Sequence, residues 1–211
     1  MNKKMVIRIL GVVMGLEAAL LMIPFIVGII YKESSTIHFL YTALLCFVLY
    51  LGLSRIQVTK KVIYAKEGFV ITSLAWIFMS LLGALPLYSS GAIPSYIDAV
   101  FEIVSGFTTT GSSILTSVED LPHCMIFWRS FTHWIGGMGV LVFILSVIRL
   151  QGDDHNMYLM RAESPGPIVG KLVPKIRNTA SLLYGIYTFM TILLILALKN
   201  DIIALKGGGT A

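Results

Sequence analysis

The sequence predicts an all-α membrane protein with about five transmembrane helices, and three observations support this prediction. Hydrophobic residues make up 56% of the 211 residues and charged residues only 13%, whereas about 25% of the residues in a soluble domain are charged. The apolar residues form stretches long enough for a helix to cross about 30 Å of hydrocarbon, which takes roughly 20 residues. The basic residues are concentrated in alternate connections between these stretches, as the two sides of a membrane require.

Five apolar stretches have the length of membrane spans. They cover approximately residues 5–30, 37–54, 69–90, 124–148 and 182–198. The first stretch follows two lysines, as the apolar part of a secretion signal does. It is too long for a signal peptide, however, and no small-residue cleavage motif ends it. We therefore interpret it as the first span.

The basic residues predict which side of the membrane each connection occupies. Most of the 16 Lys and Arg residues precede the first span, or lie between the second and third or between the fourth and fifth: Lys3, Lys4, Arg8, Arg55, Lys60, Lys61, Lys66, Arg149, Arg161, Lys171, Lys175 and Arg177. The positive-inside rule assigns these connections and the N-terminus to the cytoplasm. The net charge of +5 therefore indicates topology and contact with anionic lipid, and not nucleic-acid binding.

The segment from Ile93 to His123 is predicted to begin and end on the outer side of the membrane, opposite the cytoplasm, and it contains a helix too short to cross. Apolar residues recur at helical spacing from Ser95 to Gly106. Ser95 can cap the first turn, and Asp98 suits the positive end of the helix dipole. The predicted helix has about three turns, which is roughly half the length of a span.

An irregular stretch, Phe107–Ser113, follows this short helix. Three consecutive threonines and Gly111 disfavour continued helix. Irregular backbone at membrane depth is tolerated only where it is buried in protein or lines a watery path. Its carbonyl oxygens can replace the hydration shell of a cation, and the threonine hydroxyls can add a further oxygen layer. From these residues alone, a surface loop and a re-entrant pore loop are both open.

Three stretches of the sequence carry a family resemblance. The first is Asp98–Gly111, which reads DAVFEIVSGFTTTG. The second is Trp128-Arg-Ser with His133–Gly139 in the next span, and the third is Glu163–Pro167 with Lys171–Arg177. Together they resemble the TrkH-type membrane subunits of the Trk/Ktr/HKT superfamily of potassium transporters.

The resemblance implies a pore built from four linked membrane–pore–membrane repeats, with an extra pair of helices before them. It assigns the leading pair to 1–66, the first repeat to 67–150, a cytoplasmic loop to 151–181 and the first helix of a second repeat to 182–211. It also implies potassium uptake across a bacterial cytoplasmic membrane through a carbonyl-lined filter. Potassium would be the transported substrate, and no cofactor is implied.

The resemblance further implies site residues and a partner. The residues that match the family's filter are Thr109, Thr110, Gly111 and Ser112, with Thr108 at the inner edge. The partner would be a cytosolic ring of TrkA-like nucleotide-binding regulatory subunits. Residues 149–177 are a candidate surface for that ring.

The sequence ends after one repeat and one further span, so we expect a fragment or a subunit that must associate. Two other functions remain open. One is a non-transporting remnant or an interaction partner of full-length copies. The other is a small homo-tetrameric cation channel, in which each of four chains contributes one loop. A membrane enzyme is disfavoured, because no set of acid, base and nucleophile can be assembled.

Several other residues have two interpretations each. Glu17 inside the first span is expensive in lipid and should face protein or water, either in a functional role or in a buried polar contact. Arg129 either snorkels to the surface or places a charge near a pore mouth. The glycines of the fourth span indicate close helix packing or a hinge. Cys46 and Cys124 are interpreted as packing residues.

Overall fold

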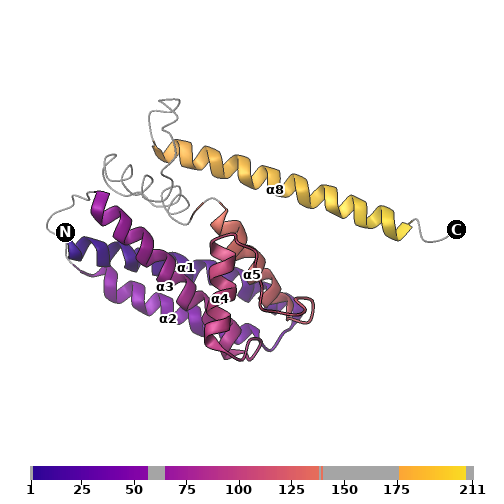
Figure 1. Cartoon of the computed structure of the whole chain (residues 1–211), viewed down its shortest axis with the longest axis horizontal. Helices are drawn as coiled ribbons and strands as arrows, with labels where there is room; N and C mark the ends of the chain where they lie inside the picture. The colour runs from indigo at the N-terminus through magenta and orange to yellow at the C-terminus, as the bar shows by residue number, and fades with distance from the viewer. Residues whose placement is uncertain (1, 57–64, 138, 140–175, 208–211) are drawn as a thin grey trace.

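This computed structural model describes residues 2–56, 65–137, 139 and 176–207. These residues form helices and no strand, which confirms the all-α prediction (Figure 1). The helices are α1 (Lys3–Tyr31), α2 (Thr36–Ser54), α3 (Ala65–Ser89), α4 (Tyr96–Phe107), α5 (His123–Gly136) and α8 (Ile176–Gly207).

Four of these helices contain a segment long and apolar enough to cross a membrane, namely Lys3–Tyr31, Thr36–Ser54, Lys66–Ser89 and Ser181–Lys199. They correspond to the first, second, third and fifth predicted spans, with ends that agree within a few residues. The predicted fourth span begins as α5, but its second part, 140–148, lies outside the described residues. Most of the predicted cytoplasmic loop at 151–181, from residue 151 to residue 175, also lies outside the described residues.

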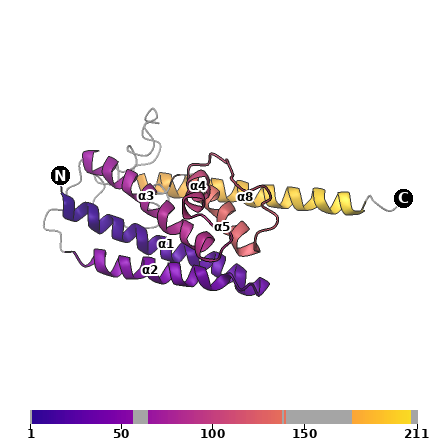
Figure 2. The same ribbon diagram turned by 60° about the horizontal axis from the view of Figure 1, so that its bottom comes forward.

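Helices α1, α2 and α3 run side by side and form the body of the molecule (Figures 1 and 2). Helix α1 packs against α2, α3 and α5, and α3 also packs against α4. The outward faces of these helices carry exposed apolar side chains such as Val48 and Phe69. In lipid such faces are solvated by hydrocarbon, so that helix association depends on close packing and on polar contacts between helices.

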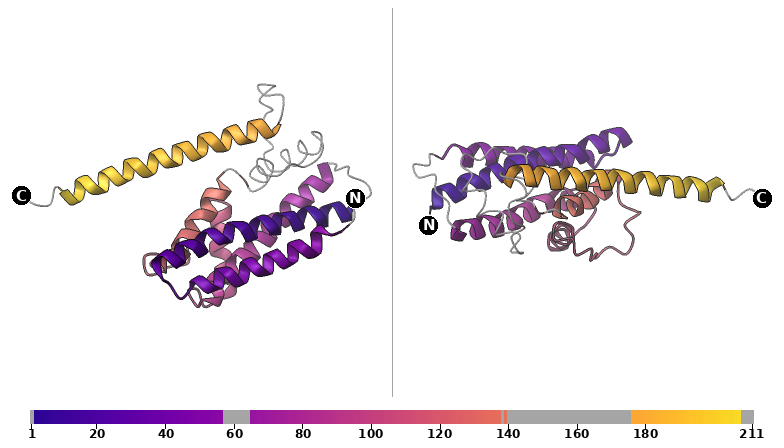
Figure 3. Two further views of the ribbon diagram at one scale, coloured as in Figure 1. Left: turned by 180° about the vertical axis from the view of Figure 1, so that it is seen from behind. Right: turned by 90° about the horizontal axis from the view of Figure 1, so that it is seen from above.

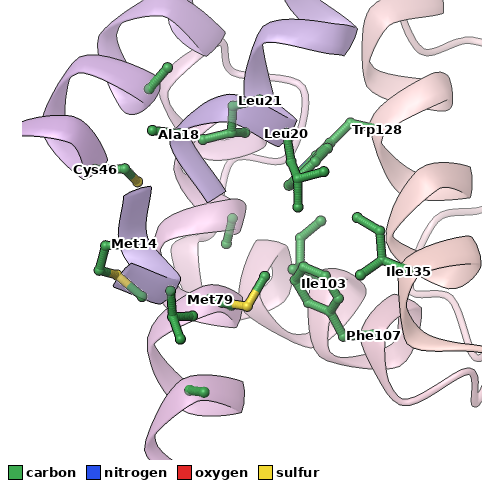
Figure 4. Packing of buried hydrophobic residues seen from close by; sticks show 14 of the residues in the cluster. Met14, Ala18, Leu20, Leu21, Cys46, Met79, Ile103, Phe107, Trp128 and Ile135 are labelled. Carbon is green, nitrogen blue, oxygen red and sulfur yellow. The ribbon is translucent and has the colours of Figure 1, made fainter. Parts of the chain in front are cut away.

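The interior of this bundle contains large side chains from every packed helix. Leu21 of α1, Phe39 of α2, Met79 of α3, Ile103 of α4 and Trp128 of α5 are almost completely buried. Figure 4 shows part of this cluster, in which Leu20, Trp128, Ile103, Phe107 and Ile135 lie near one another. The short helix α4 is packed on one side against α3 and α5.

Helix α4 is amphipathic in its packing. Its inner face carries buried Ala99, Ile103 and Phe107, whereas Ile97 and Phe101 are exposed. The sequence places these apolar residues at helical spacing, and the packing settles which of them face the bundle. The outer apolar face of α4 is exposed in part or in most of its area at Ile97, Phe101 and Val104.

Helix α8 contacts the bundle through part of its length only. Trp134 of α5 donates its indole N–H to the Thr191 hydroxyl at 3.2 Å and stacks on the Tyr187 ring. Most apolar side chains of α8 are exposed, and its far end extends away from the other helices (Figure 3).

Candidate functional site

The site begins at the first turn of α4, which the sequence predicts correctly. Ser95 has extended backbone angles and its hydroxyl accepts the Asp98 N–H at 3.4 Å. Asp98 stands in the first turn, where a negative charge suits the helix dipole. The negative end of the same dipole lies at the other terminus, beside Thr108.

The end of α4 is closed by two hydrogen bonds of the Schellman type. The Thr109 N–H donates to the Gly106 carbonyl, and the Thr110 N–H donates to the Ser105 carbonyl, each at 3.0 Å. This motif needs a left-handed residue at its centre, normally glycine. Here that residue is Thr109, with φ of 55°. A β-branched residue is strained in this conformation, so the surrounding contacts must hold it there.

The next unusual backbone position is Gly111, which has φ of 75°. A Cβ at Gly111 would meet nothing within 4 Å, so the requirement for glycine comes from the backbone angle and not from crowding. Ser105 donates its hydroxyl hydrogen bond to the Ser112 carbonyl at 2.6 Å. This hydrogen bond holds the segment after Gly111 against the last turn of α4.

The four residues matched to the family's filter thus lie together in one exposed loop with Thr108. The hydroxyls of Thr108 and Thr110 lie 2.8 Å apart, and Thr108 also donates to the Val104 carbonyl at 2.7 Å. In the described part of the chain, the carbonyl oxygens of Thr109, Thr110 and Gly111 accept no hydrogen bond. They are available to a ligand that needs oxygen donors.

A buried carboxylate supports this loop from behind. Glu102 is fully buried, accepts the Ser113 hydroxyl at 3.0 and 3.1 Å, and accepts the Ile114 N–H at 3.2 Å. Its charge is balanced by Arg129 of α5, whose Nε donates to Glu102 Oε1. A charge-assisted network of this kind fixes geometry as well as charge. We refer to Glu102, Ser113, Ile114 and Arg129 as the loop brace.

The loop brace is a feature of the candidate site that sequence reasoning missed. Arg129 does not simply snorkel to the surface, because its guanidinium turns inward to Glu102. Its placement as a charge near a pore mouth stays a prediction. One signal was present: an acidic residue on the inner face of a short helix and a basic residue in the next span. Charges in such places need partners.

Helix α5 holds α4 at close range through glycines. A Cβ at Gly106 would lie 2.2 Å from the Thr132 hydroxyl oxygen, and one at Gly136 would lie 2.1 Å from the Phe107 carbonyl oxygen. Two helices can approach this closely only without those side chains. Of the two interpretations of the fourth-span glycines, close packing is confirmed for Gly136.

An aromatic cluster fixes the same crossing. The Trp128 indole N–H donates to the Gly83 carbonyl of α3 at 2.8 Å. The Phe107 ring stands edge-on to both Trp128 and Trp76, with centroids 6.4 and 6.1 Å apart. Such T-shaped pairs are the favoured arrangement for aromatic rings. They set the position of the residue immediately before the loop.

The start of α5 is capped by a residue from the α1–α2 connection. Glu33 accepts the His123 N–H at 2.6 Å and the Cys124 N–H at 2.9 Å, and its Oε1 lies 2.8 Å from His123 Nδ1. Partial burial raises the pKa of Glu33, but the hydrogen bonds from Cys124 and His123 outweigh it and lower the pKa from 4.5 to about 2. The preceding residue, Pro122, offers no side-chain cap of its own.

The packing interpretation of the two cysteines agrees with the structure, where both are free thiols and both are buried. Within the described ranges, no group of three or more His, Cys, Asp or Glu side chains is placed to hold a metal ion.

Comparison with known proteins gives consistent results. Residues 33–208 match the TrkH family, described as cation transport proteins. The chain is 34% identical over 205 residues to the Trk system potassium uptake protein TrkH of Escherichia coli K12, covering 94% of this chain and 41% of that protein. It is also 34% identical over 194 residues to an uncharacterized cation transporter of Methanocaldococcus jannaschii, covering 92% and 40%.

A solved structure shows the same fold. The crystal structure of the potassium transporter TrkH from Vibrio parahaemolyticus superimposes with a TM-score of 0.74 and 28% identity, covering 92% of this chain and 38% of that one. The chain therefore spans about two fifths of the length of the relatives it matches.

Proposed function

Because the chain belongs to the TrkH family of cation transport proteins, we propose that it forms part of a potassium uptake pathway across a cytoplasmic membrane. The ion is the substrate, and its passage involves no covalent chemistry. The names of the relatives support potassium as the ion. The family and the four candidate spans make the chain a multi-pass membrane protein.

The observation that carries the proposal is the set of free carbonyl oxygens in the loop at the end of α4. Those of Thr109, Thr110 and Gly111 accept no hydrogen bond among the described residues. A cation that sheds its water needs oxygen atoms in their place, and backbone carbonyls supply them in potassium filters. The C-terminal end of α4 adds a favourable negative potential. The Ser112 carbonyl oxygen differs from these three, because it accepts a hydrogen bond from the Ser105 hydroxyl.

One loop provides only part of a coordination shell, since potassium filters are built from rings of loops. The loop therefore acts together with further loops, supplied by additional repeats or by other chains. In this arrangement α1 and α2 are the leading pair, α3, α4 and α5 form the first repeat, and α8 begins the second. The N-terminus is cytoplasmic. A TrkA-like regulatory ring would bind on the cytoplasmic side. Most of its candidate surface, residues 149–175, lies outside the described residues.

The test uses a bacterium that lacks its own potassium transporters. It expresses either this chain or a chimaera in which the chain replaces the matching part of the Escherichia coli relative. Growth at low potassium and rubidium uptake are measured for each and for its Gly111→Asp variant. Gly91→Asp is the matched control, because Gly91 also has positive φ, 78°, and open space around it.

The outcomes separate the candidate functions. Uptake by the chain alone that is lost in Gly111→Asp supports a homo-oligomeric channel. Uptake only by the chimaera, again lost in Gly111→Asp and kept in Gly91→Asp, supports a pore that needs further repeats. A chimaera that transports equally well with Gly111→Asp contradicts the assignment of this loop to the ion path.

A further inference from the structure

Glu17 stands at the middle of α1 and is fully buried, yet neither carboxyl oxygen has a hydrogen-bond partner in the described part of the chain. The other buried carboxylates there are different. Glu102 has the three partners of the loop brace, and Glu67 accepts the Asn2 N–H at 3.0 Å. From the sequence, Glu17 could have either a functional role or a buried polar contact. The described residues provide no hydrogen bond to its carboxyl oxygens.

The Glu17 carboxyl group lies where four helices meet. Its Oε1 is 3.4 Å from the position that a Cβ on Gly83 of α3 would occupy. The same position is 3.2 Å from the Trp128 ring of α5 and 3.4 Å from the Ile103 side chain of α4. The indole N–H of Trp128 is already used by the Gly83 carbonyl. The carboxyl group therefore shares the space beside Gly83 with an aromatic ring and an aliphatic side chain.

No positive charge compensates Glu17 within the described residues. The titratable side chain that interacts with it electrostatically is Cys46 of α2. On α4 and α5, Glu102 and Arg129 are paired with each other. An uncompensated carboxylate in an apolar interior is far more costly than the neutral acid. An ionisable group inside a membrane protein is also a functional-site candidate in its own right.

We propose that Glu17 is an intramembrane proton-binding site, in which a bound proton keeps the carboxyl group neutral at the junction of α1, α3, α4 and α5. Loss of the proton would place a negative charge against Trp128 and Ile103. Trp128 of α5 and Ile103 of α4 are both fully buried in the bundle interior, so the junction would have to admit water or a cation. Proton binding and the packing behind the loop are thus linked, and by linkage each affects the other. This inference stands on packing alone and does not depend on ion transport.

Infrared spectroscopy of the full chain in phospholipid vesicles at neutral pH tests this inference. The glutamate carboxyl groups carry ¹³C, which shifts their bands and separates them from aspartate. A protonated glutamate gives a carboxylic-acid C=O band distinct from the carboxylate bands. We expect this band in the unmodified chain, its loss in Glu17→Gln and Glu17→Leu, and its retention in Glu119→Gln. Glu119 is the control because it lies on an exposed loop.

Two results would overturn the proposal. The first is a spectrum of the unmodified chain without a protonated glutamate band at neutral pH, and that result requires no variant to fold. The second is a band that persists in a folded Glu17→Gln or Glu17→Leu variant, since it would then belong to another glutamate. A negative result in the transport test would not change the protonated glutamate band of the unmodified chain or of the Glu17 variants. The proton-binding proposal and the proposed transport function can therefore be rejected independently.

Discussion

At the scale of single residues, Thr109 is the most strained described position of the loop. Its left-handed backbone closes α4, and the neighbouring hydrogen bonds from Thr109 and Thr110 hold it in place. Such strain persists where the surroundings over-determine the conformation, and it gathers at functional sites. The strained conformation of Thr109 costs folding stability, and it fixes the backbone path of the loop.

This strain can be measured by replacing Thr109. We expect Thr109→Gly to stabilise the folded chain by about 0.5–1 kcal/mol, because relief of the left-handed conformation exceeds the entropy cost of glycine. Thr110→Gly is the control, since Thr110 is not among the residues with positive φ, and it should destabilise the chain. Thermal unfolding in detergent measures both. Equal loss of stability in the two variants would show that Thr109 is not strained.

The loop brace gives a second prediction for single residues. Glu102→Ala leaves the half-buried Arg129 charge without its partner and removes the acceptor of Ser113 and Ile114. Breaking one side of a fully buried ion pair costs about 3–5 kcal/mol, and the partial exposure of Arg129 places this change at the lower end of that range. We expect a loss of this size in thermal unfolding, and Glu102→Leu combined with Arg129→Met should recover much of it. Asp98→Ala, on the exposed face of the same helix, should cost under about 1 kcal/mol.

At the scale of elements, the crossing of α4 and α5 sets the position of the loop. The close approach at Gly136 involves the Phe107 carbonyl, which is backbone and cannot rotate away. We expect Gly136→Ala to displace the last turn of α4, and to lower both the thermal midpoint and rubidium uptake of the chimaera. Gly185→Ala on α8 is the matched control, because a Cβ there meets nothing within 4 Å. It should gain roughly 0.5–1 kcal/mol from helix propensity.

The Glu33 cap makes the start of α5 sensitive to acid. The pKa of Glu33 falls from 4.5 to about 2 in the fold, so its contribution is present above pH 4.5 and is lost as the pH falls toward 2. We expect thermal stability to decline over that interval in the unmodified chain. Glu33→Gln should be less stable at pH 6 and should decline less on acidification. Glu119→Gln, on an exposed loop, should behave as the unmodified chain; an unchanged acid profile in Glu33→Gln would argue against the cap.

At the scale of the whole molecule, sequence reasoning succeeded wherever the information was local. Span length and hydropathy predicted α1, α2, α3 and α8, and helical spacing with a Ser95 cap predicted α4 within one residue. The contacts that sequence reasoning missed join residues distant in the chain, as Arg129 joins Glu102 and as Glu33 joins α5. No local pattern specifies such pairs. The roles of the loop residues in ion passage stay predictions.

The orientation of the whole chain gives a prediction that labelling can check. With Cys46 and Cys124 replaced by alanine, Lys4→Cys and Glu119→Cys each supply one thiol at an exposed position. The positive-inside rule assigns these positions to opposite sides. A membrane-impermeant maleimide should label Glu119→Cys in intact cells, and Lys4→Cys only after permeabilisation. The reverse pattern would invert the proposed topology.

The loop is assembled almost entirely from its own neighbourhood. Every described hydrogen bond of Thr108–Ser113 is made to a residue between Glu102 and Leu115, and Arg129 of α5 in turn holds Glu102. Contacts of short sequence separation form early and with little loop-closure cost. During synthesis the loop can therefore reach its final hydrogen bonding as soon as α5 enters the bilayer, before α8 leaves the ribosome. Its backbone path is complete while the rest of the chain is still being made.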